Sequence, residues 1–363
     1  MAEETSRDWY EQYVKKNRVF ILGAGFSAAA GVPLTASLLD KALKKFAAEC
    51  PGIFSRVDGY AKESTENVDL EVDYSKIDFS DLCTFLEYIE LREYGGGERW
   101  KDAGSREKLA LRFYLAKTIA EHTPDAANLP DLYVEFAAQL HEHDIVISFN
   151  WDGLLEVALQ KLGKLYTYNF KEEGSIKLCK LHGSINWRLD APNNLGTPVD
   201  TLGWESLGFT EGMLETEIYH TPSLLKYSTW SHYSPLGEVE PFLVLPGHGK
   251  AFDVRSNAVL WYKPEFAFAT THDIYIIGLS LAPDDFFIRS LFLSNLPFIN
   301  SYSGVTGRKV FIINPDPCCE KNYRFVLSKG YAQLLKQEFS IAHVNLVKDR
   351  LKDAVAVGAP VTR

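Results

Sequence analysis

The sequence predicts an α/β fold in which a mostly parallel β-sheet carries helices on both faces. Short apolar runs of the kind that form buried strands recur along the chain, at 18–22, 144–149, 176–181, 241–245, 273–277 and 309–313. Stretches with apolar residues at helical spacing separate several of these runs. Strands that alternate with helices favour parallel pairing, because the crossover helices cover the two faces of the sheet.

The N-terminal third combines one strand with a series of helices. The first apolar run ends at Gly23 and leads into a short helix-compatible segment, 27–30. Thr35 then caps a strongly helical stretch over 36–48. The polar stretch 51–78 predicts an irregular, exposed excursion. Further helices are expected at 79–94, 106–122 and 131–141. Because no strand separates these helices, they predict a helical insertion within the α/β frame.

The α/β frame resumes after this helical insertion. Helices are expected over 153–162, 286–296 and 325–337. Residues 187–240 are rich in Gly, Pro, Thr and aromatic side chains with weak periodicity, which favours a second, irregular insertion. We therefore expect one domain over 1–345 with insertions at about 36–141 and 187–240, followed by a mildly amphipathic C-terminal tail, 346–363.

The composition is that of a soluble globular protein and disfavours several classes. No run of apolar residues is long enough to span a membrane, and the polar N-terminus does not resemble a signal peptide, so we expect a cytoplasmic protein. The 48 acidic and 38 basic residues give a net charge of -10, which disfavours a free-standing nucleic-acid binder. The 5 cysteines contain no C-x-x-C pair, so neither a disulfide framework nor a four-thiolate zinc site is expected.

A glycine-rich turn follows the first predicted strand. Gly23-x-Gly25-x-x-Ala28 fits the relaxed dinucleotide-binding fingerprint of Rossmann-like folds, with a strand before it and a helix after it. The first glycine permits the tight turn, the second lets the backbone approach a pyrophosphate, and the helix N-terminus favours negative charge. The alternative is a glycine turn that only packs the helix on the strand. The context on both sides favours nucleotide binding.

Polar residues also follow two later strands. Asn150 and Asp152 come after the run 144–149, at the sheet edge where α/β folds place ligand contacts. Either residue is also an adequate cap for the helix that follows, so a structural role stays open. His182 comes directly after the run 176–181, and a histidine near its ordinary pKa of about 6.5 suits general-base chemistry. A satisfied polar residue is the alternative for His182.

In combination these segments resemble the sirtuin superfamily, and specifically its prokaryotic sirtuin-like NAD+-hydrolase branch, which is associated with anti-phage defence. The matching segments are Gly23-Ala24-Gly25-Phe26-Ser27 with Gly31-Val32-Pro33, then Asn150-Trp151-Asp152, Leu181-His182-Gly183-Ser184, Gly278-Leu279-Ser280 and Ile313-Asn314. They span about residues 18 to 315, and their order is more specific than any single segment.

The resemblance implies a Rossmann core that binds NAD+ and breaks its nicotinamide–ribose bond. By match, the segment Gly23-Ala24-Gly25-Phe26-Ser27 would bind the pyrophosphate. Asn150 and Asp152 would line the pocket for the nicotinamide ribose, and His182 would be the catalytic histidine. The adenosine half would contact Gly278, Ser280 and Asn314.

Departures from the family pattern separate this chain from the protein deacylases. Those enzymes carry Asp-Phe-Arg where this chain has Leu34-Thr35-Ala36, and Gln where it has Phe149. Their four-cysteine zinc module is replaced by the aromatic insertion 187–240. These differences disfavour peptide deacylation. The segment Leu281-Ala282-Pro283-Asp284-Asp285 also resembles the hydrolase branch.

We therefore expect an NAD+ glycohydrolase that releases nicotinamide and ADP-ribose, with NAD+ as substrate and no metal. The alternatives are a non-catalytic NAD+ or ADP-ribose sensor, and a protein deacylase or ADP-ribosyltransferase. Unregulated NAD+ hydrolysis is toxic, so we expect control by homo-oligomerisation or by a partner such as an Argonaute-type protein or a HerA-type ATPase. The helical insertion and the tail are the expected contact surfaces. We expect no direct nucleic-acid binding and no membrane association.

Overall fold

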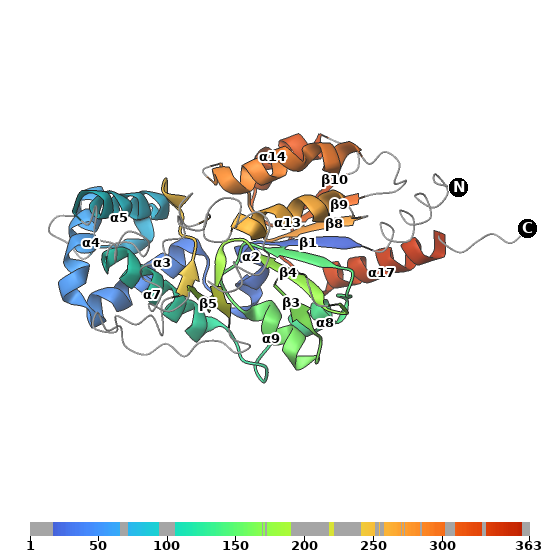
Figure 1. The fold of residues 1–363 in the computed structure, drawn as a ribbon, viewed down its shortest axis with the longest axis horizontal. Coiled ribbons are helices and arrows are strands. Elements are labelled where there is room, and N and C mark those ends of the chain that lie inside the picture. The colour runs from blue at the N-terminus through green and yellow to red at the C-terminus, as the bar shows by residue number, and fades with distance from the viewer. Residues whose placement is uncertain are drawn as a thin grey trace, which may run out of the picture.

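A central sheet covered by helices and a helical block beside it make up the molecule (Figure 1). The computed structural model describes residues 17–65, 72–93, 106–168, 170, 173–189, 218–220, 241–250, 254, 258–269, 271, 273–283, 285–301, 309–328 and 332–357. Most of the second predicted insertion, 187–240, and the end of the tail lie outside the described residues.

The central sheet has seven strands in the order β10-β9-β8-β1-β2-β4-β3, and all its strand pairs are parallel. The chain runs from β1 outward through β2 to β4 and then returns to β8 on the other side of β1. The crevice between the ends of β1 and β8 is therefore a topological switch point, where open α/β sheets bind ligands. The strands are β1 (Arg18–Leu22), β2 (Ile145–Ser148), β3 (Tyr166–Thr167), β4 (Ile176–Lys180), β8 (Asp273–Ile277), β9 (Lys309–Ile313) and β10 (Ala332–Leu335).

Helices cover both faces of this sheet, which confirms the predicted fold class. Along β1, Phe20 and Leu22 belong to one buried core while Val19 and Ile21 belong to another, because successive side chains of a strand point to opposite faces. One face packs against α8 (Asp131–Ala138), α9 (Leu154–Lys161) and α17 (Ile341–Val357). The other packs against α13 (Ala258–Ala269), α14 (Phe286–Ser301) and the short helices α15 (Cys319–Asn322) and α16 (Arg324–Leu327). Strands buried on both faces explain the continuous apolar runs in the sequence.

The helical block has a core of its own and lies at the end of the molecule opposite α17 (Figure 1). It consists of α3 (Thr35–Glu49), α4 (Pro51–Ser64), α5 (Phe79–Glu93) and α7 (Arg106–His122). A small antiparallel sheet, β6-β5-β7, contributes Ile185 and Leu243 to this core, and Leu245 follows just after β7. Its strands are β5 (Gly183–Leu189), β6 (Ile218–His220) and β7 (Pro241–Leu243). The small sheet therefore joins the helical block to the end of β4.

The structure corrects two local predictions. The stretch expected to be irregular contains α4, whose Ile53, Phe54 and Val57 are buried at helical spacing beneath a polar outer face. The helix expected over 325–337 ends at Leu327, and residues 332–335 form the edge strand β10 instead. An edge strand with half-exposed residues lacks the continuous apolar run of the inner strands, so the sequence pattern did not reveal it.

Three general features of the described residues bear on function. All five cysteines are free thiols. No group of three or more His, Cys, Asp or Glu side chains in the described ranges is arranged to hold a metal ion. No helix within the same ranges is long and apolar enough to cross a membrane.

Candidate functional site

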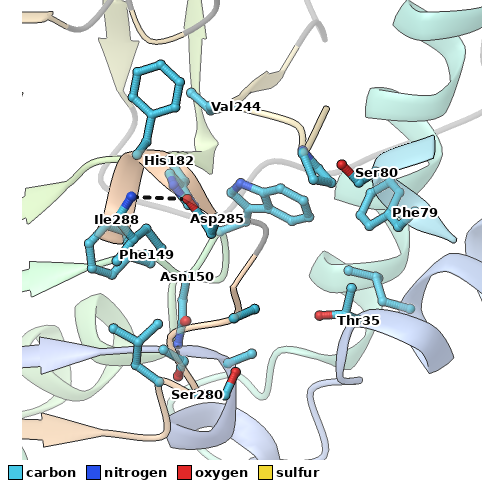
Figure 2. A pocket seen from close by; sticks show the side chains of 18 of the residues that line it. Thr35, Phe79, Ser80, Phe149, Asn150, His182, Val244, Ser280, Asp285 and Ile288 are labelled. Carbon is cyan, nitrogen blue, oxygen red and sulfur yellow. Dashed lines mark hydrogen bonds between the residues drawn. The ribbon is translucent and has the colours of Figure 1, made fainter. Parts of the chain in front are cut away.

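A cavity of ≈ 420 Å³ opens at the carboxyl edge of the central sheet, between the switch point and the helical block. Its polar wall comes from the ends of four elements: the turns after β1, β2, β4 and β8, which contribute Gly23, Asn150, His182 and Ser280. Figure 2 shows Asn150, His182 and Ser280 on one side of the cavity and Thr35, Phe79 and Ser80 of the helical block on the other. The volume falls in the usual range for small-molecule sites.

The glycine turns after β1 and β8 pack directly on each other. Gly25 N donates to Gly278 O at 2.9 Å, and Gly23 N donates to Ile277 O at 2.9 Å. Gly278 has a φ of 67°, and a Cβ there would lie 2.1 Å from Phe26 N. The glycines thus serve backbone-to-backbone packing at the switch point. Gly23 and Gly278 also line the cavity, whereas Gly25 does not.

The helix after the glycine turn is shorter than the fingerprint implies. It is a single turn, α2 (Ala24–Ser27), followed by a 3-10 turn over Ala28–Ala30. The N–H groups of Gly25 and Phe26 already donate to Gly278 O and Gly23 O. A single turn sums few peptide dipoles, so this terminus offers an anion less than a long helix does. Ala24 lines the cavity, but Phe26 is buried in the sheet core.

Asn150 is held by two hydrogen bonds from its amide nitrogen. Nδ2 donates to Gly23 O at 2.9 Å and to Ser27 Oγ at 3.1 Å. Because a carbonyl oxygen only accepts, the amide orientation is fixed with Nδ2 toward the glycine turn. Ser27 Oγ in turn donates to Asp152 Oδ2 at 2.8 Å. The arrangement leaves the Oδ1 acceptor of Asn150 for the cavity, which this residue lines.

Asp152 fixes the Ser27 hydroxyl group that in turn holds Asn150. Its Oδ1 accepts from Leu154 N at 3.1 Å, so it also caps the first turn of α9, as the sequence alternative proposed. Burial raises the pKa of Asp152, and the nearby Lys180 cation and the Ser27 hydroxyl oppose that rise. Lys180 Nζ bonds the backbone oxygen of Asp152 at 2.5 Å and the Glu156 carboxylate at 2.8 Å. Asp152 is therefore a buried orienting group as well as part of the cavity wall.

His182 lines the same cavity and is only 8% exposed. Its ring packs against Phe149 at 5.1 Å and Trp261 at 6.2 Å between centroids. Its Nε2 atom is buried and has no hydrogen-bond partner. Burial, reinforced by the Lys250 cation, lowers its pKa to about 3, although Asp285 and a backbone hydrogen bond to Phe149 oppose this. The structure thus corrects the expectation of a near-ordinary pKa, because the apolar surroundings disfavour the imidazolium.

Two cavity residues next to His182 were not assigned a role from the sequence. Lys250 Nζ lies 3.0 and 2.9 Å from the two carboxylate oxygens of Asp285. Among the described residues that line the cavity, Lys250 is the only Lys or Arg. The sequence feature that could have identified Lys250 is the Gly-rich turn Pro246-Gly247-His248-Gly249-Lys250. This turn directly follows an apolar run, as the other turns of the site do.

The far end of the cavity, toward the helical block, is mostly apolar apart from the hydroxyl groups of Thr35 and Ser80. Val32, Leu38, Phe79, Ile119 and Trp151 line it. The Phe79 ring meets the Trp151 indole edge to face, with centroids 6.3 Å apart. The Trp151 Nε1 atom is buried without a partner. The cavity therefore joins a polar end at the sheet to an apolar end with one unsatisfied donor, which suits a ligand that carries an aromatic ring.

The predicted site residues divide into two groups. The cavity wall contains Gly23, Ala24, Asn150, Asp152, His182, Gly278 and Ser280. Ser27 lies behind it and orients Asn150, and Gly25 and Phe26 form its support. Asn314 follows β9 at the same sheet edge but does not line the cavity, and its Oδ1 accepts from Asp316 N at 2.9 Å.

Comparison with known proteins gives structural similarity only. No family model and no curated protein matches the sequence. Among solved structures, the chain is similar to a mutant Sir2 homologue in complex with ADP-ribose, at 15% identity and TM-score 0.43, over 96% of this chain and 98% of that one. It is also similar to Sir2Tm bound to a propionylated peptide, at 13% identity and TM-score 0.33, over 98% and 99%. A Sir2–p53 peptide–NAD+ complex matches at 13% identity and TM-score 0.35, over 98% and 100%. At these identities and scores the similarity assigns neither a family nor an activity to this chain.

Proposed function

We propose that this chain is a sirtuin-like NAD+ glycohydrolase that binds NAD+ in the cavity at the switch point and hydrolyses its nicotinamide–ribose bond. One observation carries the proposal. The turns after β1, β2, β4 and β8, identified separately in the sequence, bring Gly23, Asn150, His182 and Ser280 into one cavity wall. That wall combines backbone groups, an oriented amide and a neutral imidazole at the place where α/β folds bind nucleotides.

The residues present fit a dinucleotide. The buried Nε2 of His182 has no protein partner, and a buried polar atom without a partner is costly unless a ligand or water satisfies it. The oriented Oδ1 of Asn150 supplies an acceptor for a hydroxyl group or water. The apolar end of the cavity, with the unsatisfied indole donor of Trp151, suits an aromatic base that carries a polar substituent.

The reaction needs neither a general acid nor a strong base in the site. Nicotinamide leaves a cationic pyridinium glycoside as a neutral molecule, so its departure needs no general acid. Water that adds to the resulting electron-poor ribose carbon becomes strongly acidic, so even a weak base accepts its proton. In our proposal Asn150 orients that water and His182 accepts the proton. A pKa of about 3 keeps His182 neutral throughout the physiological range.

The test is turnover of NAD+ by the purified full chain, with nicotinamide and ADP-ribose measured by chromatography. We expect Asn150→Ala and His182→Gln to reduce turnover by ~10²-fold, because one removes the group that orients the water and the other removes the base, for which ~10²-fold is the lower end of the typical contribution. His143→Gln is the matched control, since that side chain is 45% exposed and lies outside the cavity. Turnover that survives in both cavity variants, with the fold intact, contradicts the assignment.

A non-catalytic nucleotide sensor is the second candidate, and one observation favours it. A histidine with a pKa of about 3 is a weak base, and a weak base contributes less to proton transfer near neutral pH. Tight NAD+ or ADP-ribose binding without nicotinamide release distinguishes this function. A deacylase or ADP-ribosyltransferase would instead consume NAD+ only with an acceptor substrate.

The biological setting is also part of the proposal. The ordered resemblance to the prokaryotic hydrolase branch supports NAD+ depletion during anti-phage defence, with activity controlled by self-association or by a regulatory partner. The domain organisation that we propose, one domain with a helical insertion, places the helical block against the cavity, so a partner bound to the block has direct access to the site. Size-exclusion chromatography with light scattering, with and without lysate from infected cells, tests this control. A constitutively active monomer contradicts it.

A further inference from the structure

The loop 246–250 is fixed to the helical block by its backbone. Gly249 N donates to Glu87 Oε2 of α5 at 2.7 Å, and His248 N donates to Thr84 Oγ1 at 3.2 Å. A Cβ at Gly249 would lie 2.6 Å from the Glu87 carboxyl carbon, so a larger residue there would displace this carboxyl group from its present position. The loop therefore delivers its last residue, Lys250, into the cavity from a defined position.

The Lys250 side chain ties this loop to the other wall of the cavity. Its Nζ bonds both carboxylate oxygens of Asp285, and the two side chains are only 7% and 22% exposed. Asp285 Oδ1 also accepts from Ile288 N at 3.1 Å, which caps the first turn of α14 (Figure 2). The ion pair thus has a fixed backbone anchor on each side, and both residues line the cavity with His182.

Burial has the largest effect on the pKa of His182, and both charges of the ion pair add to or oppose that effect. Lys250 disfavours protonation of the ring and Asp285 favours it. Three neighbouring segments contribute further ionisable groups. Asp152, after β2, and His248, in the loop 246–250, line the same cavity, and Lys263 belongs to α13, whose Trp261 packs on the ring. Lys263 Nζ lies over the Phe170 ring at 5.5 Å, so it serves as a control for a cation on a neighbouring element.

We propose that the Lys250–Asp285 ion pair is a positioning element of the site, in which Lys250 neutralises Asp285 and so preserves the neutral, proton-accepting form of His182 that burial of the ring favours. The electrostatic coupling depends only on the geometry of these side chains, and its catalytic value rests on the proposed function. Without Lys250, the Asp285 carboxylate would stand unpaired near the ring and would favour imidazolium. Without Asp285, the Lys250 cation would stand unpaired and favour the neutral ring further.

Removal of the Lys250 cation and removal of the Asp285 carboxylate should therefore change the pKa of His182 in opposite directions. An opposite charge near a titrating group typically shifts its pKa by about 1–3 units. We expect Lys250→Met to raise the pKa of His182 by about 1 unit or more, so that the ring begins to protonate by pH 5. We expect Asp285→Asn to leave the ring neutral at that pH. Lys250→Arg keeps the cation and should restore the wild-type behaviour.

The readout is the histidine Cε1 signal of the full chain, labelled with carbon-13 histidine and followed by NMR from pH 7.5 to the lowest pH at which each variant stays folded. His182→Gln identifies the signal of His182 by its loss. Lys263→Met is the matched control and should behave as the wild type. Glu87→Ala provides a second route, because it removes the acceptor of the Gly249 N–H, and a loosened loop should shift the signal in the same direction as Lys250→Met.

The outcomes separate this inference from the proposed function. If the pH dependence of the His182 signal in Lys250→Met and in Glu87→Ala is the same as in the wild type, the inference is overturned, whether or not the protein hydrolyses NAD+. An equal shift in Lys263→Met also overturns it, because the effect would then be unspecific. The expected shifts in a protein that never releases nicotinamide leave the coupling standing and contradict the proposed function. In an active protein, the acid limb of the pH–rate profile should move to higher pH in Lys250→Met.

Discussion

The burial of His182 makes a quantitative prediction about acid stability. The ring has an ordinary pKa of 6.5 in the unfolded chain and a pKa of about 3 in the folded protein. Between these values the unfolded state binds a proton that the folded state does not, so the free energy of unfolding falls as the pH falls through this window. The loss is complete below the folded pKa, where it amounts to about 5 kcal/mol, at 1.36 kcal/mol for each pKa unit.

A neutral substitution should remove this loss. Between pH 7 and pH 5 the same linkage gives about 2 kcal/mol, because the unfolded ring is mostly protonated at pH 5 and the folded ring is not. His182→Gln is neutral at both pH values, so its free energy of unfolding should fall by about 2 kcal/mol less than that of the wild type. Asp285 does not interfere, since its own pKa lies below the ordinary carboxyl value of 3.8.

The assay is equilibrium urea unfolding followed by tryptophan fluorescence at pH 7 and pH 5, for the wild type, His182→Gln and the exposed control His143→Gln. The control should follow the wild type. If His182→Gln loses as much stability on acidification as the wild type does, the folded histidine is not held neutral by burial, and the account of its environment is wrong.

Three further predictions concern the support of the site. Ser27→Ala removes the hydroxyl group that lies between Asp152 and Asn150, so it should lower the free energy of unfolding by about 1–3 kcal/mol, measured by urea unfolding. In initial-rate measurements it should lower kcat more than it raises KM. Ser55→Ala, at an exposed serine, is the control. Gly278→Ala places a Cβ 2.1 Å from the backbone nitrogen of Phe26, at a residue with positive φ, so it should lower the free energy of unfolding by roughly 2–4 kcal/mol. A Tm equal to that of the wild type would contradict the close packing of the two glycine turns. Lys180→Met leaves the Glu156 carboxylate buried without its cation and should lower the free energy of unfolding by about 3–5 kcal/mol. The double variant with Glu156→Gln should regain part of that stability. If the losses of stability in the two single variants simply add in the double variant, the ion pair does not contribute as described.

The fold could be predicted from the sequence because the inner strands are buried on both faces. Val19 to Leu22 are all apolar for that reason, and the same holds for the inner part of β2 and β8. The glycine, amide or histidine that follows each strand is visible in the sequence, and the parallel sheet brings these ends together. The cavity wall follows from that topology.

The parts that the sequence did not reveal depend on contacts between distant segments. Lys250 reaches the site only because its loop docks on Glu87, which lies 162 positions before Gly249 in the chain. The low pKa of His182 arises from burial of its ring, on which Phe149 and Trp261 pack from separate elements, and from the Lys250 cation. The short α2 and the internally bonded N–H groups of its turn follow from the contact with Gly278. No local pattern encodes these effects.

NAD+ hydrolysis by this chain is tested by incubating NAD+ with the purified chain in water highly enriched in oxygen-18 and analysing the products by mass spectrometry. We expect equal amounts of nicotinamide and ADP-ribose, one oxygen-18 atom in each ADP-ribose, and loss of both products in Asn150→Ala. Bound NAD+ that stays intact in the wild type, or release that is unchanged in Asn150→Ala, would contradict the proposed function.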